Sequence, residues 1–134
     1  MVEFAVVFPI LVLLLIGAAD FGRVFFTSVA VANAARAGAE WGAMTPANSQ
    51  DSLGIVNFAK FDGAEAGTIT VTAQTVCRCG TTVTACSTTP NCSGYGVPKS
   101  YIEVTASKTV NLILPYPGVP NNISVSRTAT FRQQ

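Results

Sequence analysis

The sequence has no histidine, and few of its residues carry a charge. Histidine is the commonest metal ligand and general base in proteins, so its absence argues against a metal centre and against an enzyme. Charged residues are 11% of the 134, well below the roughly 25% of a typical soluble domain. The net charge of +1 and the absence of any run of like charges provide no field that would attract nucleic acid. We therefore expect a non-enzymatic protein with no cofactor, no metal and no nucleic-acid partner.

Cysteine is confined to one short segment, in which Cys77, Cys79, Cys86 and Cys92 are spaced C-x-C-x6-C-x5-C. Four thiolates could complete a zinc site, but the usual C-x2-C spacing is absent, so we expect two disulfides and an oxidising compartment. Cys77 and Cys79 share strand parity and should not bond to each other. Two pairings remain, 77–92 with 79–86 and 77–86 with 79–92. We favour the first, because a hairpin between residues 79 and 86 would bring those ends together.

Residues 4–19 read FAVVFPILVLLLIGAA and contain no charge, and Glu3 and Asp20 bound this run. As a helix the run spans about 24 Å, slightly less than a ~30 Å bilayer core. No true breaker follows before Pro46, so the pattern predicts one helix over residues 3–44, kinked or loosened at Pro9. Because residues 4–19 are apolar on every side, they must be buried in lipid or among other helices.

The second half of this helix should lie against a globular head. Its small residues would let another layer approach closely; they are Ala32, Ala35, Gly38, Ala39 and Gly42. A short helix should follow, capped by Asn48 or Ser49 and running to about Phe61 before Gly63. We expect its apolar contacts from Leu53, Val56, Phe58 and Phe61.

From residue 67 onward the hydrophobic period changes to two, which predicts strands over residues 68–77, 101–114 and 123–132. Their apolar faces would hold Ile69, Val71, Ala73 and Cys77; Ile102, Val104, Ala106, Val110, Leu112 and Leu114; and Ile123, Val125, Ala129 and Phe131. Lys108 and Arg127 fall on the apolar-face parity, so we expect a bulge or a strand end near each. A proline-rich turn, PYPGVPNN at 115–122, joins the last two strands. The expected fold class is α+β: a helix over residues 1–44 and a head over residues 45–134 with a three- or four-stranded antiparallel sheet packed on that helix.

The ordered set of motifs resembles the TadE-like family of tight-adherence pseudopilins. The residues that carry the resemblance are Glu3-Phe4, Pro9, the aliphatic run, DFGR at 20–23, AARAG at 34–38, the cysteine-bearing loop, YIEVTAS at 101–107 and SRTATFR at 126–132. In that family the glutamate usually stands fifth after the cleavage site, whereas here it is third.

The resemblance implies a leader removed by a prepilin peptidase, single-pass residence in the inner membrane and export by the Tad machinery into a type IV-like pilus. It further implies that Glu3 pairs with the terminal amine of a neighbouring subunit. Phe4, Pro9, Asp20 and Arg23 are the other candidate assembly residues.

Asn91 and Asn122 each begin an N-x-Ser motif and are candidate glycosylation sites. We attribute both motifs to chance in a sequence rich in serine and threonine.

The expected function is a structural subunit of an extracellular bacterial filament for surface attachment, which assembles with copies of itself through its N-terminal helix. Two alternatives remain: a minor or priming pseudopilin of such a pilus, and a membrane-anchored periplasmic binding or scaffold domain.

Overall fold

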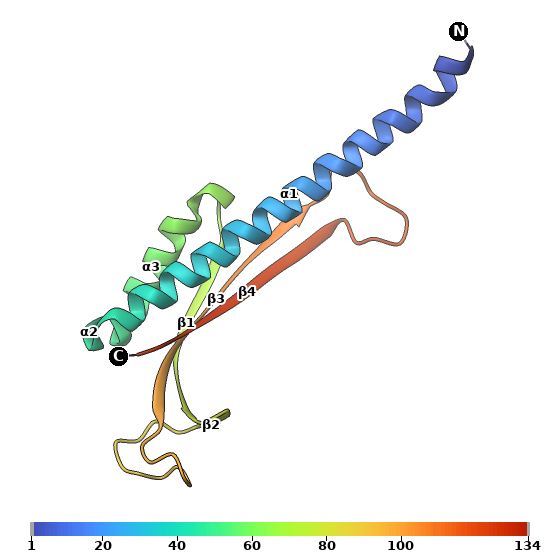
Figure 1. Cartoon of the computed structure of the whole chain (residues 1–134). Coiled ribbons are helices and arrows are strands. Elements are labelled where there is room, and N and C mark those ends of the chain that lie inside the picture. The colour runs from blue at the N-terminus through green and yellow to red at the C-terminus, as the bar shows by residue number, and fades with distance from the viewer. Residues whose placement is uncertain (1, 134) are drawn as a thin grey trace.

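One long helix dominates the computed structural model, which describes the backbone of residues 2–133 and side chains from residue 4 onward (Figure 1). This helix, α1, spans Val2–Met44 and continues through Pro9. Its N-terminal half projects beyond the rest of the molecule, while its second half lies along the sheet (Figure 1). The predicted helix and the α+β class are confirmed.

Three short helical segments follow α1: α2 (Pro46–Gln50), α3 (Ser52–Asp62) and the 3-10 helix η1 (Gly63–Ala66). The predicted cap at Asn48 or Ser49 is wrong. Thr45 caps α2, because its hydroxyl oxygen accepts a hydrogen bond from the N–H of Asn48 at 3.1 Å. Asp51 caps α3 in the same way, accepting from the N–H of Gly54 at 2.8 Å. Two caps in succession divide the expected helix into two.

Two of the four apolar contacts predicted for this helix are confirmed: Val56 packs against the core, and Phe58 stacks on Trp41 with ring centroids 6.0 Å apart. Leu53 and Phe61 are exposed, so the prediction is wrong for them. The buried positions of α3 are Ile55 and Ala59, which face α1. The small Ala59 is favoured there because α1 and α3 approach closely.

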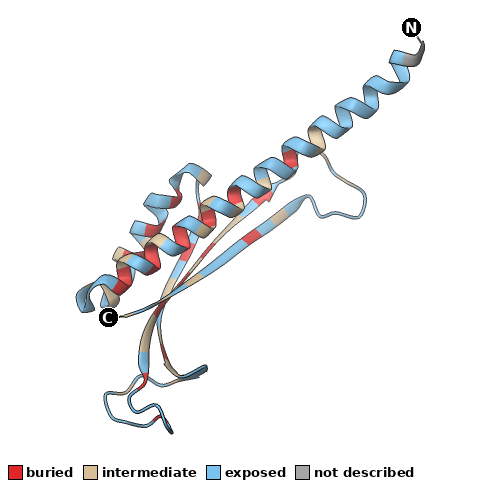
Figure 2. Ribbon diagram, viewed as in Figure 1, coloured by how far each residue is buried: buried red, intermediate tan, exposed pale blue. Residues whose placement is uncertain are grey.

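The sheet has four antiparallel strands in the order β2-β1-β3-β4. The strands are β1 (Thr70–Cys79), β2 (Thr82–Thr84), β3 (Lys99–Asn111) and β4 (Asn122–Arg132). The second half of α1 covers one face, and buried residues line the side of the helix that meets the sheet (Figure 2). The core consists of Val31, Ala34, Ala35, Ala39, Ala43, Ile55, Ala59, Ile69, Val71, Ile102, Val104 and Ala106.

No bulge or strand end accommodates Lys108 or Arg127, so that prediction is wrong. The β3–β4 register runs without interruption, with Ala106 opposite Arg127 and Lys108 opposite Val125. Arg127 instead donates to the Ser28 hydroxyl on α1 at 2.6 Å, and Lys108 donates to the Ala66 carbonyl. Their long aliphatic stems let both residues stay in the strands while the charged ends reach polar partners.

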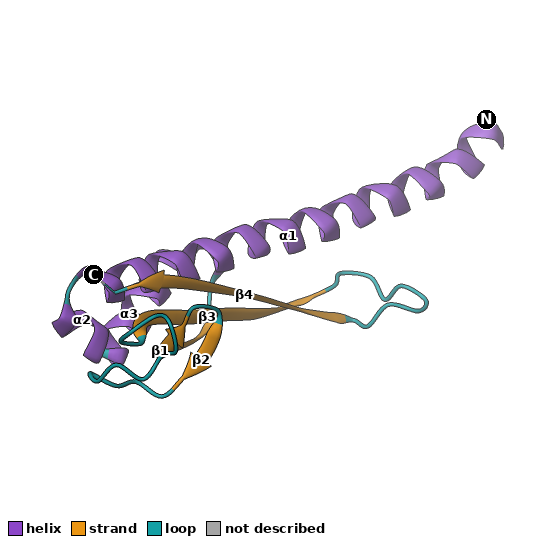
Figure 3. Ribbon diagram, turned by 60° about the horizontal axis from the view of Figure 1, so that its bottom comes forward, coloured by secondary structure: helices purple, strands orange, loops and turns teal. Residues whose placement is uncertain are grey.

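Strand β3 ends three residues earlier than predicted, at Asn111. Leu112 and Leu114 therefore belong to the connection between β3 and β4, residues 112–121, which we call the proline loop. The N–H of Leu112 bonds to the Asn121 carbonyl at 2.8 Å, and Pro115 has no N–H to continue a ladder. The loop extends alongside the N-terminal half of α1 (Figure 3).

Two disulfides are present, as predicted, but the favoured pairing is wrong. Cys77 bonds to Cys86 and Cys79 bonds to Cys92, with Cα separations of 5.1 and 5.4 Å. The β1–β2 hairpin turns immediately after Cys79, pairing Cys79 with Thr82 and Cys77 with Thr84. Cys86 follows Thr84 by two residues and so lies near Cys77. The bonds hold residues 85–98, which we call the disulfide loop, at the end of the sheet opposite the proline loop (Figure 1).

Candidate functional site

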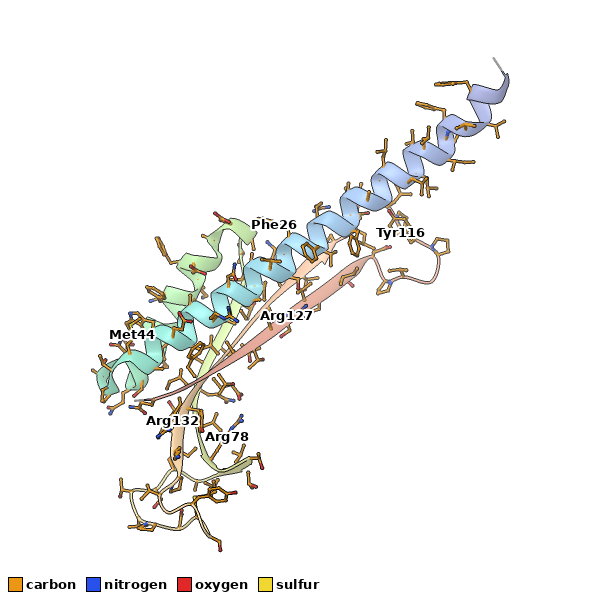
Figure 4. The ribbon with its side chains drawn as sticks, in the orientation of Figure 1. Phe26, Met44, Arg78, Tyr116, Arg127 and Arg132 are labelled. Atoms are coloured by element: carbon orange, nitrogen blue, oxygen red, sulfur yellow. A yellow bond between two sulfur atoms is a disulfide. The ribbon has the colours of Figure 1, made fainter. Side chains whose placement is uncertain are left out.

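The first part of α1 exposes apolar side chains on all sides. Every residue from Phe4 to Leu15 is exposed, and the large side chains range from 37% exposed at Val12 to 73% at Phe4. Figure 4 shows side chains projecting outward along this part of the helix, which extends beyond the rest of the molecule. We call residues 4–19 the apolar half of α1.

The apolar surface of residues 4–15 must be buried by something other than this chain. Burying one large aliphatic or aromatic side chain is worth roughly 1.5–3 kcal/mol, and ten such side chains lie between Phe4 and Leu15. Within the described residues, Phe4–Met44 is long and apolar enough to cross a membrane, and only 6% of its most apolar window is buried. Lipid and other apolar helices are the two covers that suit a helix apolar on every side.

The other half of α1 is packed against the head. We call residues 27–43 the packed half. A Cβ added to Gly42 would lie 2.7 Å from Cδ1 of Ile55, and one added to Gly38 would lie 2.8 Å from Cβ of Ala59. These two glycines therefore let α3 approach α1 to a distance that no larger residue permits. The expectation that small residues face the head is confirmed at these positions.

Asp20 marks the boundary between the two halves and holds the proline loop against the helix. It is only 4% exposed, and its two carboxylate oxygens accept from the N–H of Ile113 at 3.0 and 3.1 Å. The Tyr116 hydroxyl donates to the same carboxylate at 3.3 Å. Charge-assisted bonds of this kind compensate for the burial of a carboxylate.

Arg23 provides a partner for Asp20 from the next turn. One guanidinium nitrogen lies 3.6 Å from Asp20 Oδ1 and donates to the Asn111 carbonyl at 3.4 Å. Because the Arg23 side chain is more than half exposed, this ion pair is weak. Asp20 differs from an ordinary helix-surface partner because it is buried beneath the proline loop.

The position of Tyr116 beside Asp20 changes the pKa of its phenol. Burial against α1, together with the charge of Asp20 and the hydrogen bond to it, raises the pKa of the Tyr116 phenol above its usual value. The phenol is therefore a neutral donor at physiological pH. Figure 4 shows Tyr116 on the proline loop beside α1.

The candidate assembly residues fall into two groups. The Glu3 side chain lies outside the described residues, so its expected pairing remains a prediction. Phe4 stacks on Phe8, with ring centroids 6.5 Å apart, and both rings are exposed. Asp20 and Arg23 already have partners within the chain, which leaves Phe4 and Pro9 on the surface that needs a cover.

A further apolar stripe was missed by sequence reasoning. Phe21, Phe25 and Val29 are exposed at intervals of four residues, so they lie on one side of α1 past Asp20, and Phe26 is exposed beside them. The spacing could have been found in the sequence. It extends the apolar surface of the helix toward the head.

The remaining candidate sites are the cysteines and the two N-x-Ser motifs. No group of three or more His, Cys, Asp or Glu residues suited to a metal occurs within residues 4–133. The four sulfurs that a zinc site would need are joined as disulfides. Asn91 and Asn122 are both exposed, and their glycosylation remains untested.

These features define a class of protein. It has a disulfide-bonded α+β head packed on one end of a long helix, and the other end of that helix is exposed and apolar enough to cross a membrane. Residues 1–40 match the family model described as TadE-like protein, which confirms the resemblance over that segment. The family is a structural, non-enzymatic kind of protein, and a Tad pilus pseudopilin-like subunit fits both the match and the apolar helix. No curated protein and no solved structure matches the chain significantly.

Proposed function

We propose that the chain is a structural subunit of an extracellular Tad-type, type IV-like bacterial filament used for surface attachment. Before assembly, the apolar half of α1 spans the inner membrane; after assembly, it packs against the same helix of neighbouring copies. The observation that carries the proposal is the complete exposure of residues 4–15, because a helix exposed on all sides can be covered by several sister helices at once.

The division of α1 supports the same proposal. The hydrophobic core of the head forms against the packed half, so the apolar half can move from lipid into a helical bundle without disturbing that core. The family match covers residues 1–40 and thus includes the whole apolar half. The two disulfides suit a head that reaches an oxidising compartment. A prepilin peptidase and the Tad export machinery are the partners that this route requires.

Electron microscopy of the purified full-length chain after detergent removal tests this function. Uniform filaments are the expected result. Monodisperse particles would contradict self-assembly and favour a minor or priming pseudopilin, or an anchored periplasmic domain, either of which the match to residues 1–40 would also support.

The role of Glu3 is tested in the same assay by Glu3→Ala, with Glu65→Ala on the exposed surface of η1 as the matched control. We expect Glu3→Ala to lower filament yield while the control assembles normally. An unchanged yield would exclude the proposed pairing of Glu3.

A further inference from the structure

The proline loop has a composition unlike that of the rest of the head. No charged residue occurs from Thr109 to Ser126, and the loop contains Ile113, Leu114 and Val119. Ile113 and Val119 are exposed, although the loop belongs to the part of the molecule that folds as a globular domain. The disulfide loop is also uncharged, but it is rich in serine and threonine.

The fold places this apolar loop beside the apolar half of α1. Leu114 lines a hollow together with Pro9, Val12 and Ile16 of the helix. At 1.5 Å per residue, Ile16 and Val12 lie about 6 and 12 Å beyond Asp20 toward the N-terminus. Any membrane that surrounds the apolar half must therefore also meet the tip of the proline loop.

An ordinary loop would be excluded from this position, because an unpaired backbone N–H in hydrocarbon costs several kcal/mol. Proline residues and internal hydrogen bonds reduce the number of such N–H groups in the proline loop. Pro115, Pro117 and Pro120 have no N–H. Leu112, Ile113 and Val119 donate their N–H groups to Asn121, Asp20 and Tyr116, respectively. Six of the ten residues 112–121 therefore have no free backbone donor.

Aromatic residues lie at the level where the membrane boundary would fall. Tyr116 contacts the helix between Gly17 and Asp20, and Phe21 and Phe25 are exposed just past Asp20. Tyrosine is enriched at this depth in membrane proteins because its ring is apolar and its hydroxyl is polar. Phe21 and Phe25 add apolar rings on the helix at the same level.

We infer that the proline loop is a second membrane-binding element, which inserts its apolar side chains into the lipid bilayer beside α1 before assembly. Lipid is the occupant because the loop surface is continuous with the helix surface that lipid covers at that stage. This inference rests on the membrane residence proposed above. The loop would provide a second contact that restricts the orientation of the head relative to the membrane.

Tryptophan fluorescence in vesicles of brominated phosphatidylcholine tests this inference on the full-length chain. In a Trp41→Phe background, a single tryptophan is introduced by Val119→Trp in the proline loop, Val97→Trp in the disulfide loop or Leu13→Trp in the apolar half. Val119 and Val97 are 45% and 42% exposed, so the two loop variants are matched, and any intrinsic preference of tryptophan for the interface affects both equally. Circular dichroism and disulfide mapping verify that each variant is folded.

The expected result is loss of fluorescence in brominated relative to unbrominated lipid for the variants at 13 and 119, with no loss for the variant at 97. Quenching at 13 without quenching at 119 would overturn the inference while leaving membrane residence intact. Unquenched but blue-shifted emission at 119 would assign the loop to a second copy and also overturn it. Absence of quenching at 13 would refute membrane residence itself. Quenching of all three would also overturn the inference, because the disulfide loop lies at the end of the sheet opposite the proline loop and should stay out of the lipid.

Discussion

The two halves of α1 are parts of one helix but are built for different surroundings. Every residue from Phe4 to Leu15 is exposed and nearly all are large and apolar, whereas the packed half buries alanine, glycine and valine against α3 and the sheet. Large side chains suit a helix that must be covered by lipid or by other helices, and small ones suit a helix that a folded head approaches closely. The difference shows that one helix can carry two separable functions, one in each half.

The largest expected effect comes from placing a charge in the apolar half. Leu14→Arg should lower membrane partitioning about 100-fold, because an arginine near the bilayer centre costs roughly 2.5–3.5 kcal/mol on insertion scales. Filament formation should be lost as well. Flotation of the full-length chain with vesicles measures the partitioning, and electron microscopy measures the assembly.

The control is Leu53→Arg on α3, because Leu53 and Leu14 are similarly exposed, at 69% and 62%. It should partition and assemble like the wild-type chain. If both variants behaved alike, exposure of leucine in general, rather than the apolar half, would determine the behaviour.

The next largest effect is expected from a substitution in the packed half of α1. Gly42→Leu should destabilise the head by about 1–3 kcal/mol, because the new side chain would collide with Ile55 and Ile102. Gly22→Leu on the same helix should be neutral or slightly stabilising, since no heavy atom outside the local helix lies within 4 Å of its added Cβ. Chemical unfolding of both variants in detergent, followed by circular dichroism, measures the difference. Equal effects would contradict the assignment of close packing to the second half.

An effect of similar size, but confined to the boundary between the two halves of α1, is expected from Asp20→Ala. This change leaves the N–H of Ile113 without its acceptor and should destabilise the attachment of the proline loop by about 1–3 kcal/mol. Hydrogen exchange at Ile113 should accelerate, while amides of the sheet core keep their protection. Asp62→Ala at the exposed end of α3 is the control. Unchanged exchange at Ile113 would show that Asp20 does not hold the loop.

The smallest effect is a pH dependence at Tyr116. Because the pKa of this phenol is raised in the folded state, the neutral form stabilises the loop below the unfolded value of about 10. That contribution is lost as the pH rises through the higher folded pKa. Ultraviolet titration of phenolate should show one of the three tyrosines titrating last, and Tyr116→Phe should remove that component. A titration unaltered by Tyr116→Phe apart from its total amplitude would contradict the assignment.

The sequence was sufficient to predict the elements that repeat a simple pattern. The long helix, the α+β class, the three main strands and the presence of two disulfides follow from hydrophobic period and cysteine spacing, and all are confirmed. Apolar exposure in residues 4–15 follows from a run that is apolar on every side.

The predictions that failed did so where a single contact decided between alternatives. Two successive caps at Thr45 and Asp51 divided a helix that periodicity treated as one. The turn directly after Cys79 fixed the disulfide pairing, and its signal was the single glycine at position 80, where φ is +64°. The burial of Asp20 depends on a loop more than 90 residues later in the chain, so no local pattern could reveal it.

The most direct test of the account is to replace Leu13 with photoreactive benzoylphenylalanine and irradiate the full-length chain in vesicles and after assembly. We expect lipid adducts in vesicles and, in filaments, adducts that join position 13 to the α1 helix of a second copy. Leu13 lines a hollow with Leu114, so some adducts to the proline loop are expected in both states. Adducts to the chain's own head beyond the proline loop, or no difference between the two states, would contradict an exchange of lipid for sister helices.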